Sequence, residues 1–230
     1  MRISGSVALV TGANRGLGRA LTRALLDQGA ARVYAAARDP STVRDDDVVP
    51  VRLDVTDPDA IRTAADTLTD VDVVVNNAGI STEGSPLKVP LARVRADLEV
   101  NYLGPLAVAQ AFAPVLAANG GGALVNVLSV FSWTTVPPIC AYAASKAAAW
   151  SMTNALRLAL RSQGTLVVAV HCDTIDTEMS AGVDVPKHDP AYVARTVVAA
   201  VDAGQEEVLV DERTRTVKAA LADDLRLLYS

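Results

Sequence analysis

The sequence predicts an α/β fold, a doubly wound parallel sheet of about seven strands covered by helices on both faces. Two observations carry this prediction. Short Val-rich runs alternate along the chain with Ala/Leu-rich stretches of helical length. The short runs are continuously apolar rather than alternating, which is typical of strands buried on both faces. The 230 residues are 50% hydrophobic and 20% charged, which fits one domain with a substantial core.

The first half of the chain alternates regularly. Gly29 stands at the C′ position of the first helix, and Asp57-Pro58 supplies an N-cap and a first-turn proline to the second. Three consecutive glycines at 120–122 end a long helical stretch. The expected strands are 7–10, 32–36, 49–53 and 72–75, and the expected helices are 17–28, one from Asp57-Pro58, and 91–118.

The second half continues the alternation. Asp189-Pro190 has the same pattern as Asp57-Pro58 and predicts a helix start. We expect flexible loops at 39–47, 81–90 and 180–189, and the last two are candidates to cover an active site. The expected strands are 123–127, 166–172 and 208–210, and the expected helices are 142–161, one from Asp189, and 214–229.

Composition excludes several classes of protein. The net charge of −5 argues against a surface for nucleic acid or anionic lipid. No apolar run approaches the roughly 18 residues of a membrane helix, and no signal peptide is visible. The 2 cysteines, Cys140 and Cys172, form no metal-binding or disulfide pattern. We therefore expect a cytoplasmic protein without a metal.

A glycine-rich turn follows the first expected strand. Its glycines, Gly12, Gly16 and Gly18, permit a tight turn and let a pyrophosphate approach the N-terminus of the following helix. Alone, such a turn is equally compatible with an ordinary strand-to-helix connection. Its place in the first βαβ unit favours a dinucleotide site.

The TGxxxGxG spacing of this turn resembles that of the short-chain dehydrogenase/reductase family, in its compact single-domain branch. Leu53-Asp54-Val55, Asn76-Asn77-Ala78-Gly79, Asn101, and the set Ser129, Tyr142 and Lys146 also match. The resemblance covers roughly 5–180 and implies a Rossmann-like three-layer αβα sandwich. It implies a cofactor-binding half at about 1–100 and a catalytic and substrate-binding half at about 101–230. The implied nicotinamide-cofactor contacts are Thr11, Gly12, Asn14, Arg15, Gly16, Leu17, Gly18, Arg38, Asp54, Val55, Asn77, Ala78, Gly79, Tyr142, Lys146, Ile175 and Thr177.

Tyr142 and Lys146 lie one helical turn apart, so they share a face of their helix. They are the candidate proton donor and its cation, although an exposed Tyr–Lys pair is also common. A free tyrosine has a pKa of about 10, and we expect the nearby ammonium, together with the positive nicotinamide ring of the oxidised cofactor, to lower the pKa of Tyr142. By resemblance, Ser129 stabilises charge on the substrate oxygen. Ser132 and Ser145 are competing candidates for this role, but serines at such places are usually solvated or cap a turn. By the same resemblance, Asn101 kinks its helix and holds a water beside Lys146. Without the resemblance, a mid-helix polar residue that faces water is the simpler interpretation of Asn101.

The cofactor preference depends on the end of the second strand. Ala37 stands where an NAD enzyme usually presents an acid, and Arg38 follows it. With Arg15 in the glycine turn, these arginines suit a 2′-phosphate, unless both are merely solvated. We therefore expect NADP(H) to be preferred over NAD(H).

After the sixth strand the sequence departs from the family. Cys172 and Asp173 replace the usual Pro-Gly pair, which puts the nicotinamide geometry in doubt. His171 beside Cys172 is interpreted as packing rather than a metal site. We expect a mainly hydrophobic substrate pocket, unless the aromatic residues pack the loop or a subunit interface. Its lining is predicted as Phe131, Trp133, Val136, Ile139 and Met179.

These observations predict an NADPH-dependent reductase of ketones or aldehydes, or the reverse alcohol dehydrogenase, with Tyr142 as general acid or base. Two alternatives remain open: a cofactor-binding sensor or scaffold with little chemistry, and an isomerase or dehydratase on the same fold. The resemblance and the Ala-rich long helices also predict a homodimer or homotetramer.

Overall fold

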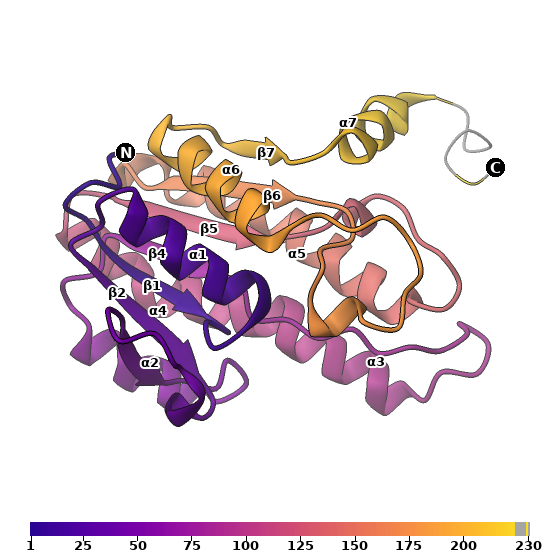
Figure 1. The fold of residues 1–230 in the computed structure, drawn as a ribbon, viewed down its shortest axis with the longest axis horizontal. Helices are drawn as coiled ribbons and strands as arrows, with labels where there is room; N and C mark the ends of the chain where they lie inside the picture. Colours follow the sequence, from indigo (N-terminus) through magenta and orange to yellow (C-terminus); the bar gives the residue numbers. More distant parts are fainter. Residues whose placement is uncertain (224–228, 230) are drawn as a thin grey trace.

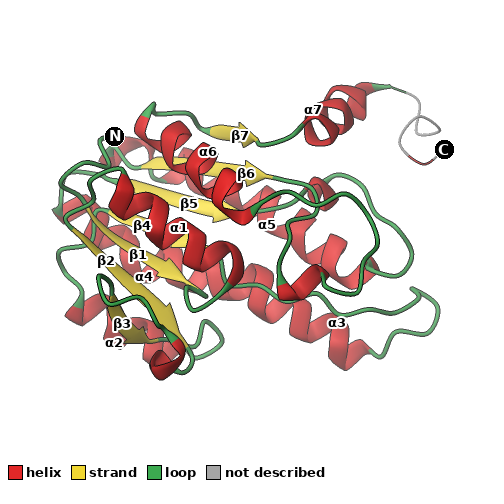
Figure 2. Cartoon of the chain, in the orientation of Figure 1, coloured by secondary structure: helices red, strands yellow, loops and turns green. Residues whose placement is uncertain are grey.

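The computed structural model describes residues 1–223 and Tyr229. Their strands form one parallel sheet in the order β3-β2-β1-β4-β5-β6-β7, which confirms the predicted doubly wound fold (Figures 1 and 2). The chain reverses its direction of growth between β1 and β4, at the centre of the sheet. The strands are β1 Val7–Thr11, β2 Arg32–Ala37, β3 Val49–Arg52, β4 Val73–Asn76, β5 Ala123–Val127, β6 Leu166–His171 and β7 Glu207–Leu209.

Helices cover both faces of this sheet (Figure 1). Along β1, Ala8 and Val10 face one core with helices α1 and α6, while Leu9 faces the other core with α2 and α4. Because both faces are covered, the central strands carry apolar side chains at successive positions. The helices are α1 Gly16–Asp27, α2 Pro58–Thr67, α3 Leu91–Leu98, α4 Gly104–Ala118, α5 Cys140–Ala159, α6 Pro190–Asp202 and α7 Glu212–Ala219.

Two of the expected helices differ from the prediction. The stretch expected at 91–118 is interrupted by a π-helical turn at Glu99–Leu103, between α3 and α4. The last helix, expected at 214–229, begins at Glu212, ends at Ala219 and is followed by a 3₁₀ turn at Ala220–Ala222. The predicted positions 224–228 lie outside the described residues.

The continuous helical stretch Leu91–Ala118 is, by length and composition alone, apolar enough to cross a membrane, with a mean hydropathy of 1.3. A helix was expected over 91–118, but not one apolar enough to span a membrane. It belongs to the core packing of this fold: Val108, Phe112 and Leu116 are buried against the sheet with α2. A core helix of a globular domain passes the same test, so this stretch is weak evidence for a membrane span.

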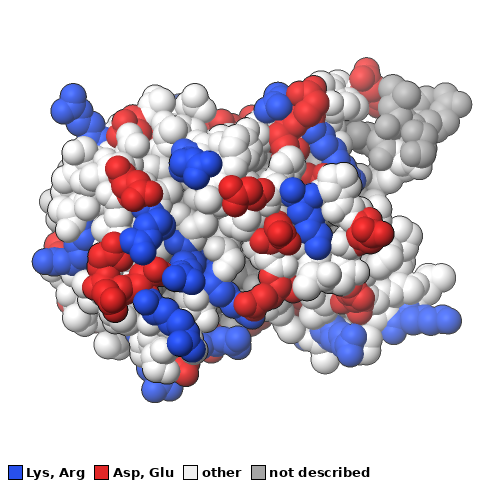
Figure 3. All heavy atoms as spheres, viewed as in Figure 1, with Lys and Arg blue, Asp and Glu red and all other residues white. Residues whose placement is uncertain are grey.

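Charged side chains of both signs intermix on the face drawn in Figure 3, most densely over α1 and the segment after β2. There Arg19 pairs with Asp45, and Arg23 pairs with Asp45 and Asp47. This pairing leaves no broad basic surface on the face in view, in keeping with the net charge of −5. Within residues 1–223 and Tyr229, no group of three or more His, Cys, Asp or Glu side chains could hold a metal ion.

Candidate active site

The carboxyl ends of β1 and β4 are tied together where the strand order reverses. The Thr11 hydroxyl accepts hydrogen bonds from the backbone N–H groups of Asn77 and Ala78, each at 3.0 Å. In return, the Asn77 amide donates to the carbonyls of Thr11 at 2.9 Å and Gly12 at 3.2 Å. In open α/β sheets, ligands bind at such a reversal of strand order. These bonds place Thr11, Asn77 and Ala78 together, as the sequence predicted.

The glycine turn fits a phosphate group. Gly12 and Gly16 have φ of +64° and +51°, which favour glycine, and a Cβ on Gly18 would lie 2.1 Å from the Gly12 carbonyl oxygen. Helix α1 begins directly after this turn, with no side-chain hydrogen bond capping it and no acidic residue in its first turn. Its first N–H groups therefore remain available to an anion.

The turn faces the segment that follows β6. A Cβ on Gly16 would lie 3.2 Å from the Thr177 side chain, so these two predicted cofactor residues lie against each other. Arg15 forms an exposed ion pair with Glu178, a second contact between the turn and this segment. Asn14 donates to the Thr42 hydroxyl at 3.1 Å, and Leu17 is buried in the core. The sequence singled out Arg15 and Thr177 but gave no sign of the Glu178 partner.

Arg38 is exposed just after β2, the strand beside β1. The backbone N–H of Thr56 and, to a smaller extent, the Arg38 charge hold the pKa of Asp54 below its usual value. Val55, the next residue, is buried. Asp39 caps a 3₁₀ turn by accepting from the Ser41 backbone and hydroxyl, which occupies its carboxylate locally. Arg38 is therefore close enough to Asp54 for its charge to act on that carboxyl.

The predicted catalytic side chains converge beyond β5. Ser129 caps a 3₁₀ turn at Val130–Ser132, and its hydroxyl accepts from the Phe131 N–H at 3.2 Å. Tyr142 and Lys146 project from α5 toward it, with the Lys146 ammonium 5.7 Å from the centroid of the Tyr142 ring. Lys146 is buried and donates to the Val127 carbonyl at 2.8 Å. The loops and helix thus assemble the three groups at the carboxyl edge of the sheet.

Burial controls the ionisation of this group. It raises the pKa of Tyr142 above its usual value, and this outweighs the lowering by the hydrogen bond with Ser129. Without the cofactor, the pKa of Tyr142 is therefore raised rather than lowered, and Lys146 is not among the groups that shift it. Burial also lowers the pKa of Lys146 to about 8. At neutral pH the phenol is a protonated acid, and the lysine is mostly charged.

Asn101 lies in the π turn and is buried. Its amide donates to the Ile80 carbonyl at 2.8 Å and to the Ser145 hydroxyl at 2.9 Å, and its oxygen accepts from the Ile80 N–H at 2.9 Å. A Cβ on Gly79 would lie 3.2 Å from that oxygen and 3.9 Å from the Lys146 nitrogen. Asn101 is therefore an internal link between the β4 loop and α5, rather than a solvated residue.

The predicted pocket residues fall into two groups. Phe131 lies edge-on to Tyr142, with ring centroids 6.5 Å apart, while Val136 and Met179 are exposed. Ile139 precedes α5 and pairs with Gly84 in an isolated parallel bridge, which joins the two loops around the site. Trp133 instead stacks on His171 and packs edge-on against Trp150. Phe131 is thus the predicted pocket residue that packs against Tyr142.

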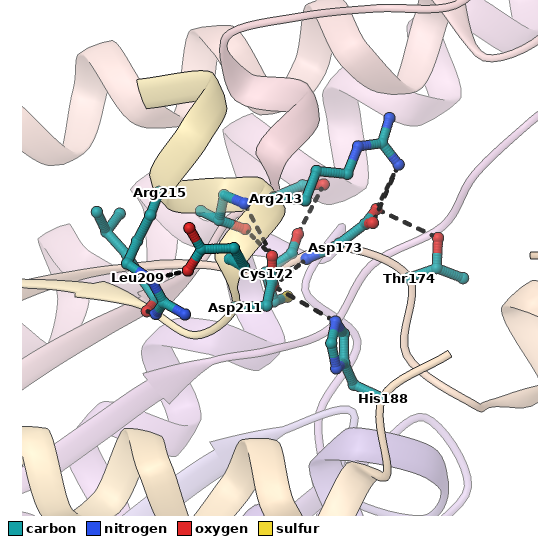
Figure 4. Close-up of polar contacts among 11 residues, drawn as sticks. Cys172, Asp173, Thr174, His188, Leu209, Asp211, Arg213 and Arg215 are labelled. Carbon is teal, nitrogen blue, oxygen red and sulfur yellow. Dashed lines mark hydrogen bonds and ion pairs between the residues drawn. The ribbon is translucent and has the colours of Figure 1, made fainter. Parts of the chain in front are cut away.

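The departure at Cys172-Asp173 has a local explanation (Figure 4). The Asp173 carboxylate accepts two 3.0 Å hydrogen bonds from Arg213 of α7, and its backbone N–H donates to the Asp211 carboxylate at 2.8 Å. Asp211 also caps α7 by accepting from Thr214. Cys172 is buried, and burial raises the pKa of its thiol to about 12. Asp173 therefore joins α7 to the loop after β6 and carries a paired charge.

Sequence reasoning missed two other polar groups beside the site. Asp97 is fully buried in α3 and accepts from the Thr82 backbone and hydroxyl, while burial raises the pKa of its carboxyl. Arg213 also lies 5.6 Å from the centroid of the Phe131 ring. An acid in a helical sequence and an arginine near the end of the chain gave no signal, because their partners come from distant segments.

Comparison with known proteins agrees with this site. The short chain dehydrogenase family model matches residues 6–187. A 1-deoxy-11-beta-hydroxypentalenate dehydrogenase of Streptomyces exfoliatus is 36% identical over 81% of this chain and 74% of its own length. A short chain dehydrogenase of Penicillium aethiopicum is 32% identical over 79% of this chain and 81% of its own. The crystal structure of a Burkholderia cenocepacia short chain dehydrogenase in complex with NADP superposes with a TM-score of 0.95, at 39% identity over 100% of this chain and 98% of that one.

The parallel sheet, its glycine turn and the Ser–Tyr–Lys group define a nicotinamide-binding oxidoreductase. The chain belongs to the short chain dehydrogenase family.

The Asp173–Arg213 pair predicts a measurable coupling. We expect Arg213→Gln to lower the free energy of unfolding at pH 7 by about 1 kcal/mol, because the Asp173 side chain is only 12% exposed and loses its cation. We expect the addition of Asp173→Asn to that variant to restore most of the lost free energy of unfolding. Urea denaturation measures both changes. Arg62→Gln, which breaks an exposed pair on α2, is the control and changes stability little. Strict additivity of the two substitutions at 173 and 213 contradicts the coupling.

Proposed function

We propose that this protein is an NADPH-dependent carbonyl reductase, which also runs in reverse as an alcohol dehydrogenase. The observation that carries the proposal is the meeting of Ser129, Tyr142 and Lys146 beside the crevice between β1 and β4. The glycine turn, the uncapped start of α1 and Thr177 fit a dinucleotide that ends at these three groups.

Reduction adds a hydride to a carbonyl carbon and a proton to its oxygen. NADPH supplies the hydride when bound. Tyr142 donates the proton from its phenol, which burial keeps protonated at neutral pH. The Ser129 hydroxyl hydrogen-bonds the same substrate oxygen and stabilises the negative charge that develops there. In the reverse direction Tyr142 accepts the proton.

Lys146 stabilises the tyrosinate that remains after the proton has left. Its ammonium lies near the face of the Tyr142 ring and is fixed by the Val127 carbonyl. A buried cation at this place favours the charged phenolate, because little solvent screens it. Asn101 positions this part of α5 through Ser145, whose hydroxyl also donates to the Tyr142 carbonyl at 2.7 Å.

We propose that NADP(H) is preferred over NAD(H). Arg38 is exposed at the end of β2, Asp39 is occupied by Ser41, and an arginine binds a 2′-phosphate by charge-assisted hydrogen bonds. The NADP held by the Burkholderia cenocepacia relative supports this choice.

For the substrate we propose a medium-sized apolar ketone or aldehyde. Phe131 packs beside Tyr142, which supports an apolar pocket. Val136 and Ile139 lie in the loop between these two residues, and Met179 lies in the segment after β6. The Streptomyces exfoliatus relative is named for a hydroxylated substrate, which supports alcohol–carbonyl chemistry.

We also propose a cytoplasmic homodimer or homotetramer. Leu158 on α5 and Leu103 before α4 are 67% and 42% exposed, which supports packing of these helices between copies. Light scattering that finds only monomer contradicts the assembly.

Tyr142→Phe tests the proton donor. We expect kcat for NADPH-dependent reduction of an apolar ketone to fall at least about 10²-fold, because the ring remains but its proton is gone. NADPH affinity, measured by fluorescence titration, stays within a few fold. Tyr192→Phe is the matched control, since Tyr192 is exposed on α6 and should leave kcat unchanged. Equal rates for Tyr142→Phe and wild type contradict the mechanism, and tight NADPH binding with no turnover of a broad carbonyl panel supports a sensor instead.

Arg38→Ala tests the cofactor preference. We expect KM for NADPH to rise about tenfold or more while KM for NADH changes little, because only NADPH carries the 2′-phosphate. Arg195→Ala, at an exposed position of α6, serves as the charge-matched control. Unchanged KM values for both cofactors would show that Arg38 is simply solvated, and a proportional rise with both would contradict a contact with the 2′-phosphate.

A further inference from the structure

His171, the last residue of β6, is fully buried and has no part in the chemistry described above. Its Nδ1 lies 3.1 Å from the carbonyl oxygen of Ser129. The imidazole also stacks on the Trp133 indole, with ring centroids 3.8 Å apart and planes 20° from parallel. The ring is thus fixed on one edge and on one face.

These contacts determine its protonation. A carbonyl oxygen only accepts, so Nδ1 must carry the hydrogen. Burial, with smaller effects of the Lys218, Arg157 and Lys146 charges, lowers the pKa of His171 to about 4, so the ring is neutral at pH 7. Its Nε2 has no hydrogen-bond partner within the described part of the chain, and the Glu207 carboxylate stands 4.0 Å away, paired with Lys218.

The contacted carbonyl belongs to the turn that presents the catalytic serine. It also accepts from the Ser132 N–H at 3.0 Å, while the Val130 N–H donates to the Cys172 carbonyl at 2.9 Å. Both contacts are made by the Ser129–Val130 peptide unit, whose carbonyl faces His171 and whose N–H is bound by the residue after β6. Loss of the His171 contact would remove one of the bonds that fix this peptide, and with it part of what holds the turn that carries the Ser129 hydroxyl.

We propose that His171 is a positioning residue for Ser129: its Nδ1–H bond and the Trp133 stack hold the turn with the hydroxyl toward Tyr142. This role rests on the proposed reductase function. A histidine that only fills space beneath the turn is the competing explanation, and the two differ in whether a donor at the Nδ1 position matters.

Three substitutions separate these explanations. In His171→Asn the side-chain amide can donate from the position of Nδ1, in His171→Gln it reaches only the position of Nε2, and in His171→Leu there is no donor. We expect kcat to fall about 10- to 100-fold in the Leu and Gln variants, as for a misplaced catalytic group, and within about threefold in Asn. KM for NADPH should stay within about threefold in all three, because the glycine turn is elsewhere.

A second measurement does not depend on turnover or on the folding of His171 variants. The chain has only 2 histidines, so ¹⁵N-histidine NMR of the wild type resolves His171 from His188, with His188→Gln assigning the signals. We expect a neutral, Nδ1-protonated ring that does not titrate between pH 5 and 9. A ring protonated at Nε2, or one that titrates near pH 6.5, overturns the proposal.

The kinetic outcomes are also separable. An active wild type whose Asn variant is as impaired as the Leu variant, or whose Leu variant is unimpaired, overturns the positioning role alone. A wild type that reduces no carbonyl overturns the proposed function, and the positioning role falls with it.

Discussion

The structure depends on one constraint: a parallel sheet buried on both faces brings the carboxyl ends of its strands to a single edge. The reversal between β1 and β4 opens a crevice there, and the Thr11–Asn77 hydrogen bonds keep its two walls together. The glycine turn follows β1, Arg38 follows β2, and Ser129 follows β5. Substrate choice therefore rests on loops attached to a rigid frame.

Burial is also what tunes the chemistry at this edge. It keeps Tyr142 protonated, brings the pKa of Lys146 to about 8, and makes His171 neutral. Lys146 and His171 lose water and gain a fixed contact in return: Lys146 with the Val127 carbonyl and His171 with the Ser129 carbonyl. Backbone carbonyls at and just beyond the end of β5 therefore hold Lys146 and His171 in place.

Local patterns predicted the strands, the glycine turn and the Tyr142–Lys146 pair, because each of these features depends on residues that are close together in the sequence. They did not predict contacts made by tertiary packing. The Arg15–Glu178 pair joins residues 163 positions apart, and Asp173 meets Arg213 across 40. The pKa of Tyr142 was misjudged for the same reason: the lysine was visible in the sequence, whereas the burial was not.

Transfer of label from deuterated NADPH tests the central claim most directly. The purified chain is incubated with an apolar ketone and NADPH carrying deuterium at the transferable C4 position, and the product is examined by mass spectrometry and NMR. The account predicts an alcohol with one deuterium on the carbinol carbon and one NADP⁺ formed for each product molecule. A product without deuterium, or one formed with no net oxidation of NADPH, would contradict it.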